Sequence, residues 1–309
     1  MSLLLLRLFQ GFVYSLNLLP LAWRYQLATG LLRLWLLFAP RNKQVAFRNL
    51  SIVFPSMGEA ELQAFYERAV AGLGKLLIDA LRAPWLSEAW VRRQVSVPNA
   101  SLIDRLHREY PGKGILFISA HLGSFEIVPH VSPLFNFPLT LVVRPFRPST
   151  IHEWWTKLRS RRGCDSIDRA DAVREMIKRL KQGRNISFVC DQNVRREQAV
   201  FVPHFGVLAA TARSIGIVIL RTGAPVVIGS LEDTGFDRYE IRLEQCDLSA
   251  VVNDSALSLD EKVQQLTLHV TRELEARILR QPERWFWFHR RWRTRPESDP
   301  TPIYGETPR

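Results

Sequence analysis

Cysteine is scarce in this chain of 309 residues, and the common cysteine motifs are missing. Its three cysteines, Cys164, Cys190 and Cys246, lie far apart, with no CxxC pair among them. An odd and widely spaced set argues against a disulfide framework and against zinc or redox sites of the CxxC type. The chain also has no HExxH motif and no tight histidine cluster, so we expect no zinc site. A reducing compartment fits this cysteine usage best.

Long uncharged hydrophobic runs are also missing, although residues 3–38 are strongly apolar. The longest uncharged run of this segment, residues 8–23, has 16 residues, whereas a comfortable transmembrane helix needs about 20. Arg7 and Arg24, at its two ends, would have to snorkel to stretch the span. No small-residue cleavage site follows, which argues against a secretory signal. The segment is a marginal transmembrane helix, a pair of interfacial helices or a buried hairpin, and we expect a membrane anchor.

Acidic residues are outnumbered by basic ones, 30 to 42, which gives a net charge of +12 and a pI of about 10.2. So positive a chain requires an anionic partner, which can be nucleic acid, anionic lipid or an acidic carrier protein. Residues 284–293 mix this charge with aromatic rings in the run RWFWFHRRWR. Such a run suits a lipid headgroup layer, stacking of single-stranded bases, or a last core element with a basic edge.

Periodicity changes along the chain and predicts its fold class. Apolar residues recur every three or four positions over residues 59–81, and residues 1–97 are typical of helices. Short apolar runs then alternate with helical stretches, which predicts an α/β fold with a largely parallel sheet flanked by helices. The expected strands are residues 114–120, 139–143, 186–190, 225–229 and, as an edge strand, 239–243. The expected later helices are residues 149–162, 168–181, 209–221 and 259–279.

We therefore expect four regions along the chain. Residues 1–40 form the membrane anchor, and a basic step at residues 41–49 follows it, as at the cytoplasmic face of a membrane. Residues 41–97 form a helical segment that packs on the core. Residues 98–296 form the α/β core, and residues 297–309, rich in Pro, Thr and Glu, form a loose tail.

No GxSxG nucleophile elbow is present, but residues 119–126, with the sequence SAHLGSFE, carry groups for acid–base catalysis. His121 comes directly after an expected strand, and the active sites of open α/β sheets gather at that end of the strands. Gly123 and Ser124 allow a turn into a helix that carries Glu126. Residues five apart on one ideal helix point about 140° apart, so the two side chains meet only if His121 stays in the turn.

Glu126 would then orient the imidazole, and His121 would act as a general base. The base would take the proton of a hydroxyl that attacks a thioester directly, so no protein nucleophile is required. Without further context, a structural histidine explains a single HxxxxE match better than catalysis does.

Several ordered blocks supply that context. Residues 119–126 resemble the HxxxxD/E block of the glycerolipid acyltransferase superfamily, and more closely that of lipid A biosynthesis acyltransferases of the lauroyl and myristoyl type. An ordered set of blocks is far more specific than any single motif. The further blocks that resemble this family are residues 44–55, 142–145, 166–169, 190–193, 201–211 and 282–296.

The resemblance implies a membrane-associated O-acyltransferase at the cytoplasmic face of a bacterial inner membrane. His121 would be the base and Glu126 its orienter. The donor would be a thioester of acyl-carrier protein or coenzyme A, and an acidic carrier would suit the basic surface. The acceptor would be a hydroxyl of a lipid A precursor, which is a phosphorylated glycolipid. The resemblance implies no metal, no bound cofactor and no nucleic acid partner.

The same resemblance assigns substrate-binding residues. Arg144 and Arg169 would face phosphate groups, because a guanidinium donates bidentate hydrogen bonds, although solvated surface arginines are the alternative. Asp191 and Asn193 would belong to the polar rim of the site, and an ordinary loop carboxylate explains Asp191 equally well. The remaining two residues, Gly206 and Thr211, would shape the pocket, although a turn glycine and a helix-cap threonine explain them nearly as well.

Two departures from the family pattern leave the acceptor open. Residues 191–193 differ from the acidic–His pattern of the best-known lipid A enzymes, and His204 stands where an aromatic residue is expected. Glu126 favours the lipid A branch, since enzymes with phospholipid acceptors usually carry Asp there. A lysophospholipid or other glycolipid acyltransferase is the first alternative. A His-based thioesterase and a non-catalytic basic protein that binds membranes or nucleic acid are the others.

Overall fold

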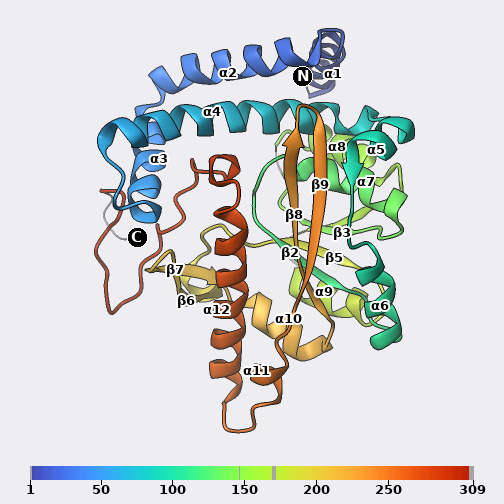
Figure 1. Cartoon of the computed structure of the whole chain (residues 1–309), viewed down its shortest axis with the longest axis vertical. Coiled ribbons are helices and arrows are strands. Elements are labelled where there is room, and N and C mark those ends of the chain that lie inside the picture. The colour runs from blue at the N-terminus through green and yellow to red at the C-terminus, as the bar shows by residue number, and fades with distance from the viewer. Residues whose placement is uncertain (1, 146, 169–171, 306–309) are drawn as a thin grey trace.

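The computed structural model describes residues 2–145, 147–168 and 172–305, which form an α/β core with a helical layer laid across one end (Figure 1). The main sheet of the described residues has seven strands in the order β1-β9-β8-β2-β5-β3-β4. All neighbouring pairs run parallel except β8 and β9. The predicted α/β fold with a largely parallel sheet flanked by helices is therefore confirmed.

The short central strands bring together segments that are far apart in sequence. β2 lies between β5 and β8, and the registers pair Ser119 with Val189 at the ends of β2 and β5. Because these two strands are parallel, the segments that follow them meet at one edge of the sheet. The bounds are β1 Val95–Ser96, β2 Leu116–Ser119, β3 Thr140–Val143, β4 Asp165–Asp168, β5 Ile186–Val189, β8 Val226–Gly235 and β9 Arg238–Cys246.

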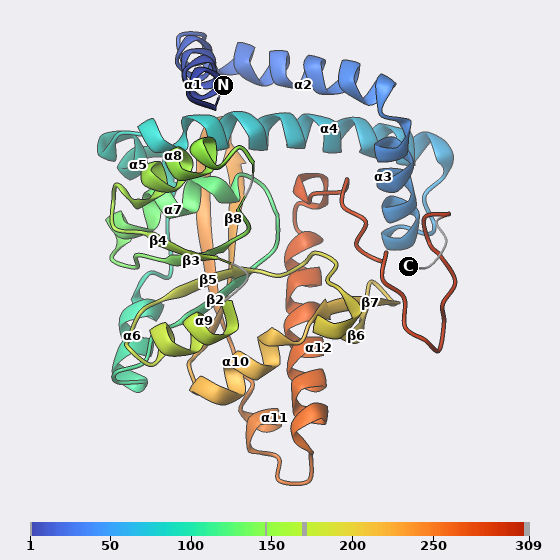
Figure 2. The same cartoon turned by 180° about the vertical axis from the view of Figure 1, so that it is seen from behind.

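Residues 2–94 are largely helical, so the helices expected over residues 1–97 are present, and only the short strand β1 at their end departs from the expectation. The long helix α4 crosses the end of the sheet, and α2 runs along the side of α4 that faces away from the core (Figures 1 and 2). At the start of α4, the carboxylate of Glu61 accepts a hydrogen bond of 2.9 Å from the backbone of Gly58. The bounds are α1 Ser2–Asn17, α2 Leu21–Phe38, α3 Pro40–Val53, α4 Glu59–Arg82, η1 Ala83–Trp85 and α5 Glu88–Gln94.

The remaining helices flank the sheet. The expected closing helix is α12, and its predicted cap is present, since the Glu261 carboxylate accepts from the Ser258 backbone at 2.8 Å. The bounds are α6 Ser101–Glu109, η2 Phe125–Ile127, α7 Val128–Val131, η3 Ser132–Phe135, α8 Ser149–Ser160, α9 Ala172–Leu180, η5 Arg196–Gln198, α10 Ser214–Thr222, α11 Ser249–Asn253, α12 Leu259–Ile278 and η6 Pro282–Arg284.

Some expected elements are wrong. The helix expected over residues 209–221 begins only at Ser214, because residues 207–212 form a strand, β7. β7 (Val207–Ala212) pairs antiparallel with β6 (Ala199–His204) in a separate two-stranded sheet. Alanine favours helices, but pairing with a neighbouring strand overrides that preference. β9 is also not an edge strand, since the two-residue β1 pairs with its outer side.

The N-terminal helices α1 and α2 expose an unusual amount of apolar surface. In residues 2–305 as described, no helix has both the length and the hydrophobicity to cross a membrane, so of the alternatives that the sequence left open the transmembrane helix finds no support. The two helices instead carry most of the exposed large apolar side chains of the described residues. On α2 these include Trp23, Leu34 and Phe38, with 65%, 53% and 81% of their surface exposed. Exposed apolar patches of this kind are unusual on the surface of a soluble protein, and they mark interaction sites.

The aromatic run near the C-terminus is a core element. Trp287 and Trp292 are fully buried and Trp285 nearly so, and these rings pack on one another. Of the three alternatives that the sequence left open, the core element with a basic edge describes these tryptophans. The tail expected to be loose has no helix or strand up to residue 305, yet it is anchored. Tyr304 donates a hydrogen bond of 2.6 Å to Asn49 of α3.

Candidate active site

A tight turn after β2 carries His121, and we call residues 120–126 the His121 turn. Gly123 has φ +55°, and a Cβ atom there would lie 2.9 Å from the carbonyl oxygen of Leu231, so glycine is required. Residues 282–296, which we call the closing segment, pair with the turn. Phe286 donates to the His121 carbonyl at 3.1 Å, and Gly123 donates to the Arg284 carbonyl at 3.0 Å. The turn is therefore held by two backbone hydrogen bonds to this segment.

Asp191, directly beyond β5, holds the imidazole of His121. Its Oδ1 lies 2.6 Å from His121 Nδ1, and its Oδ2 accepts from the His121 backbone at 3.0 Å and from Trp285 Nε1 at 2.7 Å. An ionised carboxylate only accepts, so Nδ1 must carry the proton. Nε2 is then the basic nitrogen, and it has no hydrogen-bond partner among the described residues. This tautomer is the one that a general base requires.

The charges of the pair shift both pKa values. Burial alone would lower the pKa of His121, but the charge and hydrogen bond of Asp191 outweigh it and, with a smaller contribution from Glu126, raise that pKa above 6.5. Burial would raise the pKa of Asp191, yet His121 and Trp285 hold that pKa well below its usual range. The carboxylate therefore stays ionised, and His121 is a stronger base than an ordinary histidine.

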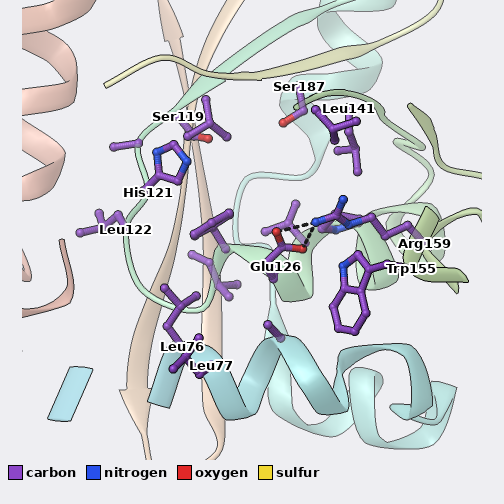
Figure 3. A pocket seen from close by; sticks show the side chains of 18 of the residues that line it. Leu76, Leu77, Ser119, His121, Leu122, Glu126, Leu141, Trp155, Arg159 and Ser187 are labelled. Atoms are coloured by element: carbon purple, nitrogen blue, oxygen red, sulfur yellow. Dashed lines mark hydrogen bonds and ion pairs between the residues drawn. The ribbon is translucent and has the colours of Figure 1, made fainter. Parts of the chain in front are cut away.

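The structure gives Glu126 a different neighbour from the one expected. The expected contact between Glu126 and the ring of His121 is absent. Both oxygens of Glu126 instead accept hydrogen bonds of 2.6 Å from Nη2 of Arg159 on α8 (Figure 3). Glu126 lies in the short 3-10 turn η2, and its carboxylate acts on His121 only through its charge. Asp191 makes the contact with the imidazole of His121 that was expected of Glu126.

An apolar cavity of about 1000 Å³ has His121 among its lining residues. His121, Glu126 and Arg159 lie on its wall, with Ser119 and Ser187 of the sheet nearby (Figure 3). Most of the lining is hydrocarbon or aromatic, and it comes from α1, α2, α4 and the strands β2, β3 and β5. The N-terminal helices thus form part of the cavity wall. A cavity of this size and lining is suited to a hydrocarbon chain.

A second cavity of about 1180 Å³ adjoins the first and has a different character. Arg144 and Val194 line both cavities. The second cavity is lined by further arginines and by aromatic rings, namely Arg195, Arg196, Arg290, Arg293, Phe286, Phe288 and Tyr304. Guanidinium groups beside flat apolar rings can bind an anionic and partly apolar group.

The other expected site residues are spread over three places. Arg144 is exposed directly after β3, where the two cavities meet. Asn193 lines the second cavity, but its side chain bonds both the hydroxyl and the backbone of Thr294 at 3.0 Å, so it also fixes the closing segment. Arg169 lies outside the described residues.

Gly206 and Thr211 line neither of the two cavities. Gly206 has φ +78° in the turn between β6 and β7, a backbone conformation that favours glycine. The Thr211 hydroxyl accepts a hydrogen bond of 2.6 Å from the buried Arg291. The structure therefore gives both residues a structural explanation, and no direct contact with either cavity.

Two residues of the site were not predicted from the sequence. Arg159 neutralises Glu126, and Trp285 completes the hydrogen bonds of Asp191. The local sequence showed Arg159 only as a basic residue on an expected helix, with no indication of its contact with Glu126. Trp285 had a stronger sign, since it lies in a block that resembles the family. Among the described residues, no three His, Cys, Asp or Glu side chains are grouped so that they could hold a metal ion.

An imidazole–carboxylate pair near the end of a parallel strand, with the imidazole on the wall of an apolar cavity, is an arrangement suited to acid–base chemistry on a lipid. The comparisons with known proteins specify the class. Residues 3–294 match the family described as bacterial lipid A biosynthesis acyltransferase, and the chain belongs to this family. It is therefore an acyltransferase of lipid A biosynthesis.

Individual relatives agree with this family. The chain is 26% identical over 297 residues to the lipid A biosynthesis lauroyltransferase of Escherichia coli K12, covering 94% of this chain and 92% of that protein. It is 25% identical over 266 residues to the lipid A biosynthesis palmitoleoyltransferase of the same organism, covering 85% and 82%. A lipid A biosynthesis acyltransferase of Haemophilus influenzae is 26% identical over 270 residues, covering 85% and 81%.

Proposed function

We propose that the protein transfers a fatty acyl chain from a thioester of acyl-carrier protein or coenzyme A to a hydroxyl of a lipid A precursor. The observation that carries the proposal is the His121–Asp191 pair, whose imidazole lies at the wall of the apolar cavity. The cavity would hold the acyl chain, and each buried methylene would contribute about 0.8 kcal/mol to binding. The names of the relatives, which mention lauroyl and palmitoleoyl chains, support a fatty acyl donor.

The chemistry follows from the tautomer of His121. Nε2 takes the proton of the acceptor hydroxyl while its oxygen attacks the thioester carbonyl carbon, and a tetrahedral oxyanion forms. The intermediate collapses, the carbon–sulfur bond breaks, and the imidazolium returns its proton to the departing thiolate. An ester and a free thiol result. The negative charges of Asp191 and Glu126 favour the imidazolium that exists between the two proton transfers.

Glu126 remains part of the proposed catalytic site in a changed role. Its carboxylate would stabilise the imidazolium through space, and Arg159 would hold the carboxylate in place through two hydrogen bonds. Arg159 also has a buried Nε atom without a hydrogen-bond partner in the described residues. That donor supports a contact of Arg159 with the substrate, since buried donors are rarely left unpaired.

The second cavity is the proposed place of the phosphorylated sugar head of the acceptor. Its arginines and aromatic rings suit phosphate groups and the apolar faces of sugar rings. Arg144 lies where this cavity meets the acyl cavity, so an acceptor bound there could present a hydroxyl towards the thioester. Asn193 would act here by fixing the wall.

The protein would attach to the cytoplasmic face of the inner membrane, and the exposed apolar side chains of α1 and α2 support attachment to a membrane surface. These helices would lie on the bilayer surface and would bury their exposed leucines and aromatics in it. Phe236, at the tip of the β8–β9 hairpin, is 66% exposed. Its ring lies edge-on to the ring of Tyr25 of α2, with 6.1 Å between the two ring centroids. The hairpin tip would thus extend the same surface.

The decisive experiment compares wild type with His121→Ala in acyl transfer from an acyl-carrier thioester to a lipid A precursor. We expect wild-type transfer and a loss of about 10³-fold in the variant, because the general base is gone. Undiminished transfer by the variant would contradict the mechanism. A folded wild type that acylates a lysophospholipid and not the lipid A precursor would overturn the proposed acceptor.

The acceptor site has its own test. We expect the double variant Arg144→Ala/Arg195→Ala to raise the KM for the phosphorylated acceptor about tenfold or more, because two phosphate donors are lost. The matched control is Arg221→Ala, which removes an exposed arginine of α10 that lines neither cavity. Equal KM values for both variants would remove the second cavity from the acceptor site.

A further inference from the structure

A fully buried carboxylate lies under the His121 turn, on the side that faces the N-terminal helices. Asp79 of α4 has no exposed surface, and its two oxygens accept hydrogen bonds from five side chains. The donors are Tyr25 at 2.7 Å, Lys75 at 2.7 Å, Arg82 at 2.8 Å, Tyr239 at 2.8 Å and Ser124. A buried charge with this many donors is held in one position.

The charge of Asp79 is compensated within the same cluster. Burial would raise its pKa, but the charges of Lys75 and Arg82 lower that pKa below the ordinary value, so the carboxylate is ionised. The two cations also reach the β8–β9 hairpin, where Lys75 pairs with Asp233 at 3.2 Å and Arg82 pairs with Asp237. The cluster therefore joins α4 to the hairpin.

Ser124 connects this cluster to the active site. It lies in the His121 turn between the two proposed catalytic residues, and only 1% of its surface is exposed. Its hydroxyl donates to Asp79 Oδ2 and also lies 3.4 Å from Lys75 Nζ. The turn has backbone contacts with the closing segment on one side, and the Ser124 side chain joins it to α4 on the other.

Tyr25 connects the same carboxylate to helix α2. Its hydroxyl donates to Asp79 Oδ1, which is the oxygen that Ser124 does not use. Two residues away, Trp23 is part of the exposed apolar surface of α2. A chain of two hydrogen bonds, through one carboxylate, thus runs from the membrane-facing helix to the turn that carries His121.

We propose that Asp79 is a positioning residue that fixes the His121 turn through Ser124 and couples the turn to α2 through Tyr25. The proposal rests on the proposed acyl transfer. Asp79 touches no substrate, and it acts on the placement of His121 and Glu126. A misplacement of catalytic groups by about 1 Å can cost up to a hundredfold in rate.

The test measures kcat and both KM values for Ser124→Ala and for Ser132→Ala. Both serines are buried and hydrogen-bonded, but Ser132 of η3 bonds Cys164 and is not part of the cluster. We expect kcat to fall about tenfold in Ser124→Ala with little change in either KM, and to stay at the wild-type value in Ser132→Ala. Melting temperatures show whether the two variants are equally stable. An equal kcat for both would overturn the positioning role.

A double-mutant cycle tests the coupling to α2. Tyr25→Phe keeps the ring and removes only the hydroxyl that bonds Asp79. If both residues act through Asp79, the double variant Tyr25→Phe/Ser124→Ala loses less activity than the product of the two single losses. Independent, multiplicative losses would overturn the coupling. Asp79→Asn is less informative, because Lys75 and Arg82 would each lose one of their counter-charges and the chain could fail to fold.

Failure of this inference can be told from failure of the proposed function. If wild type transfers the acyl chain and Ser124→Ala has the same kcat as wild type, the proposed function stands and the positioning role of Asp79 is overturned. If wild type transfers to neither a lipid A precursor nor a lysophospholipid, the proposed function fails. The same variants are then compared in hydrolysis of the carrier thioester, which also requires His121 to be in place. A normal rate of hydrolysis in Ser124→Ala would again overturn the inference.

Discussion

Asp191 sets both the tautomer and the basicity of His121, so the two residues act as one unit. The imidazole is basic because a buried carboxylate holds Nδ1 and favours the protonated ring. The raised pKa has a cost, since a larger share of His121 is protonated near neutral pH and cannot accept a proton. Activity is therefore expected to increase as the pH rises through this raised pKa.

We predict that Asp191→Asn lowers kcat on the order of 10³-fold and moves the acidic limb of the pH–rate profile to lower pH. The rate falls because the wrong tautomer becomes available, and the limb moves because the charge that raised the pKa of His121 is gone. Glu126→Gln should move the limb in the same direction by less, since its charge contributes less to the shift. Acyl-transfer rates between pH 5 and pH 9 measure both effects.

The control for these two variants is Asp104→Asn, which removes an exposed carboxylate of α6. It changes the net charge by the same amount and should leave the profile where it is. A larger shift in Glu126→Gln than in Asp191→Asn would contradict the assignment of Asp191 as the orienting residue. It would restore the role that sequence spacing gave to Glu126.

The sequence placed His121 after a strand but did not show its contact with Asp191, for a physical reason. The periodicity and the apolar run place His121 at a strand end, and this placement is correct. Asp191 comes 70 residues later, and it lies near His121 only because β5 pairs with β2. The local sequence pattern of a strand does not show which other strands it pairs with in the sheet. The pairing of Glu126 with Arg159 was missed for the same reason, since it depends on where α8 packs.

Among the secondary-structure elements, long amphipathic helices were the easiest to predict. α4 and α12 have the expected bounds to within one residue, because their apolar residues repeat over five turns or more. The helix predicted over residues 209–221 was wrong at its start. The run Ala-Ala-Thr has little periodicity of its own, and its pairing with β6 makes it part of a strand. β4 was also missed; it is short and carries two aspartates.

Close packing between helices gives a prediction for α10 and α12. A Cβ atom at Gly216 would lie 2.7 Å from Cα of Val263 and 2.8 Å from its carbonyl oxygen. Alanine favours a helix over glycine by about 1 kcal/mol, but the clash with a backbone that cannot move should outweigh this gain. We expect Gly216→Ala to lower the melting temperature by several degrees. Thermal unfolding followed by circular dichroism measures it.

Gly30 in the interior of α2 is the matched control. A Cβ atom there meets nothing within 4 Å, so only the gain in helix propensity remains. Gly30→Ala should therefore leave the melting temperature unchanged or raise it slightly. A stabilising Gly216→Ala would mean that α10 and α12 do not pack as closely as described.

The whole molecule combines an apolar surface on α1 and α2 with a net charge of +12, and both favour an anionic membrane surface. The two contributions respond differently to salt. Attraction between the positive charge and anionic lipid is screened at high ionic strength, whereas burial of apolar side chains is not weakened. Binding that survives high salt must therefore come mainly from the apolar surface.

We predict that, in high salt, the triple variant Trp23→Ser/Leu34→Ser/Phe38→Ser binds vesicles at least about a hundredfold more weakly than wild type does. These three side chains are exposed on α2 and line neither cavity, and each should contribute about 1 kcal/mol or more on burial. Flotation with vesicles that contain anionic phospholipid measures the binding. Acyl transfer to a detergent-dispersed acceptor should change little, because the cavity walls are intact.

The matched control places the same kind of change elsewhere. Val173, Leu259 and Leu279 are exposed apolar side chains outside the N-terminal helices, and their replacement by serine should leave vesicle binding unchanged. If both triple variants bind like wild type at high salt, the apolar face of α2 does not enter the bilayer. If only low salt supports binding of wild type, positive charge holds the enzyme at the membrane. In that case the exposed face of α2 would need another partner.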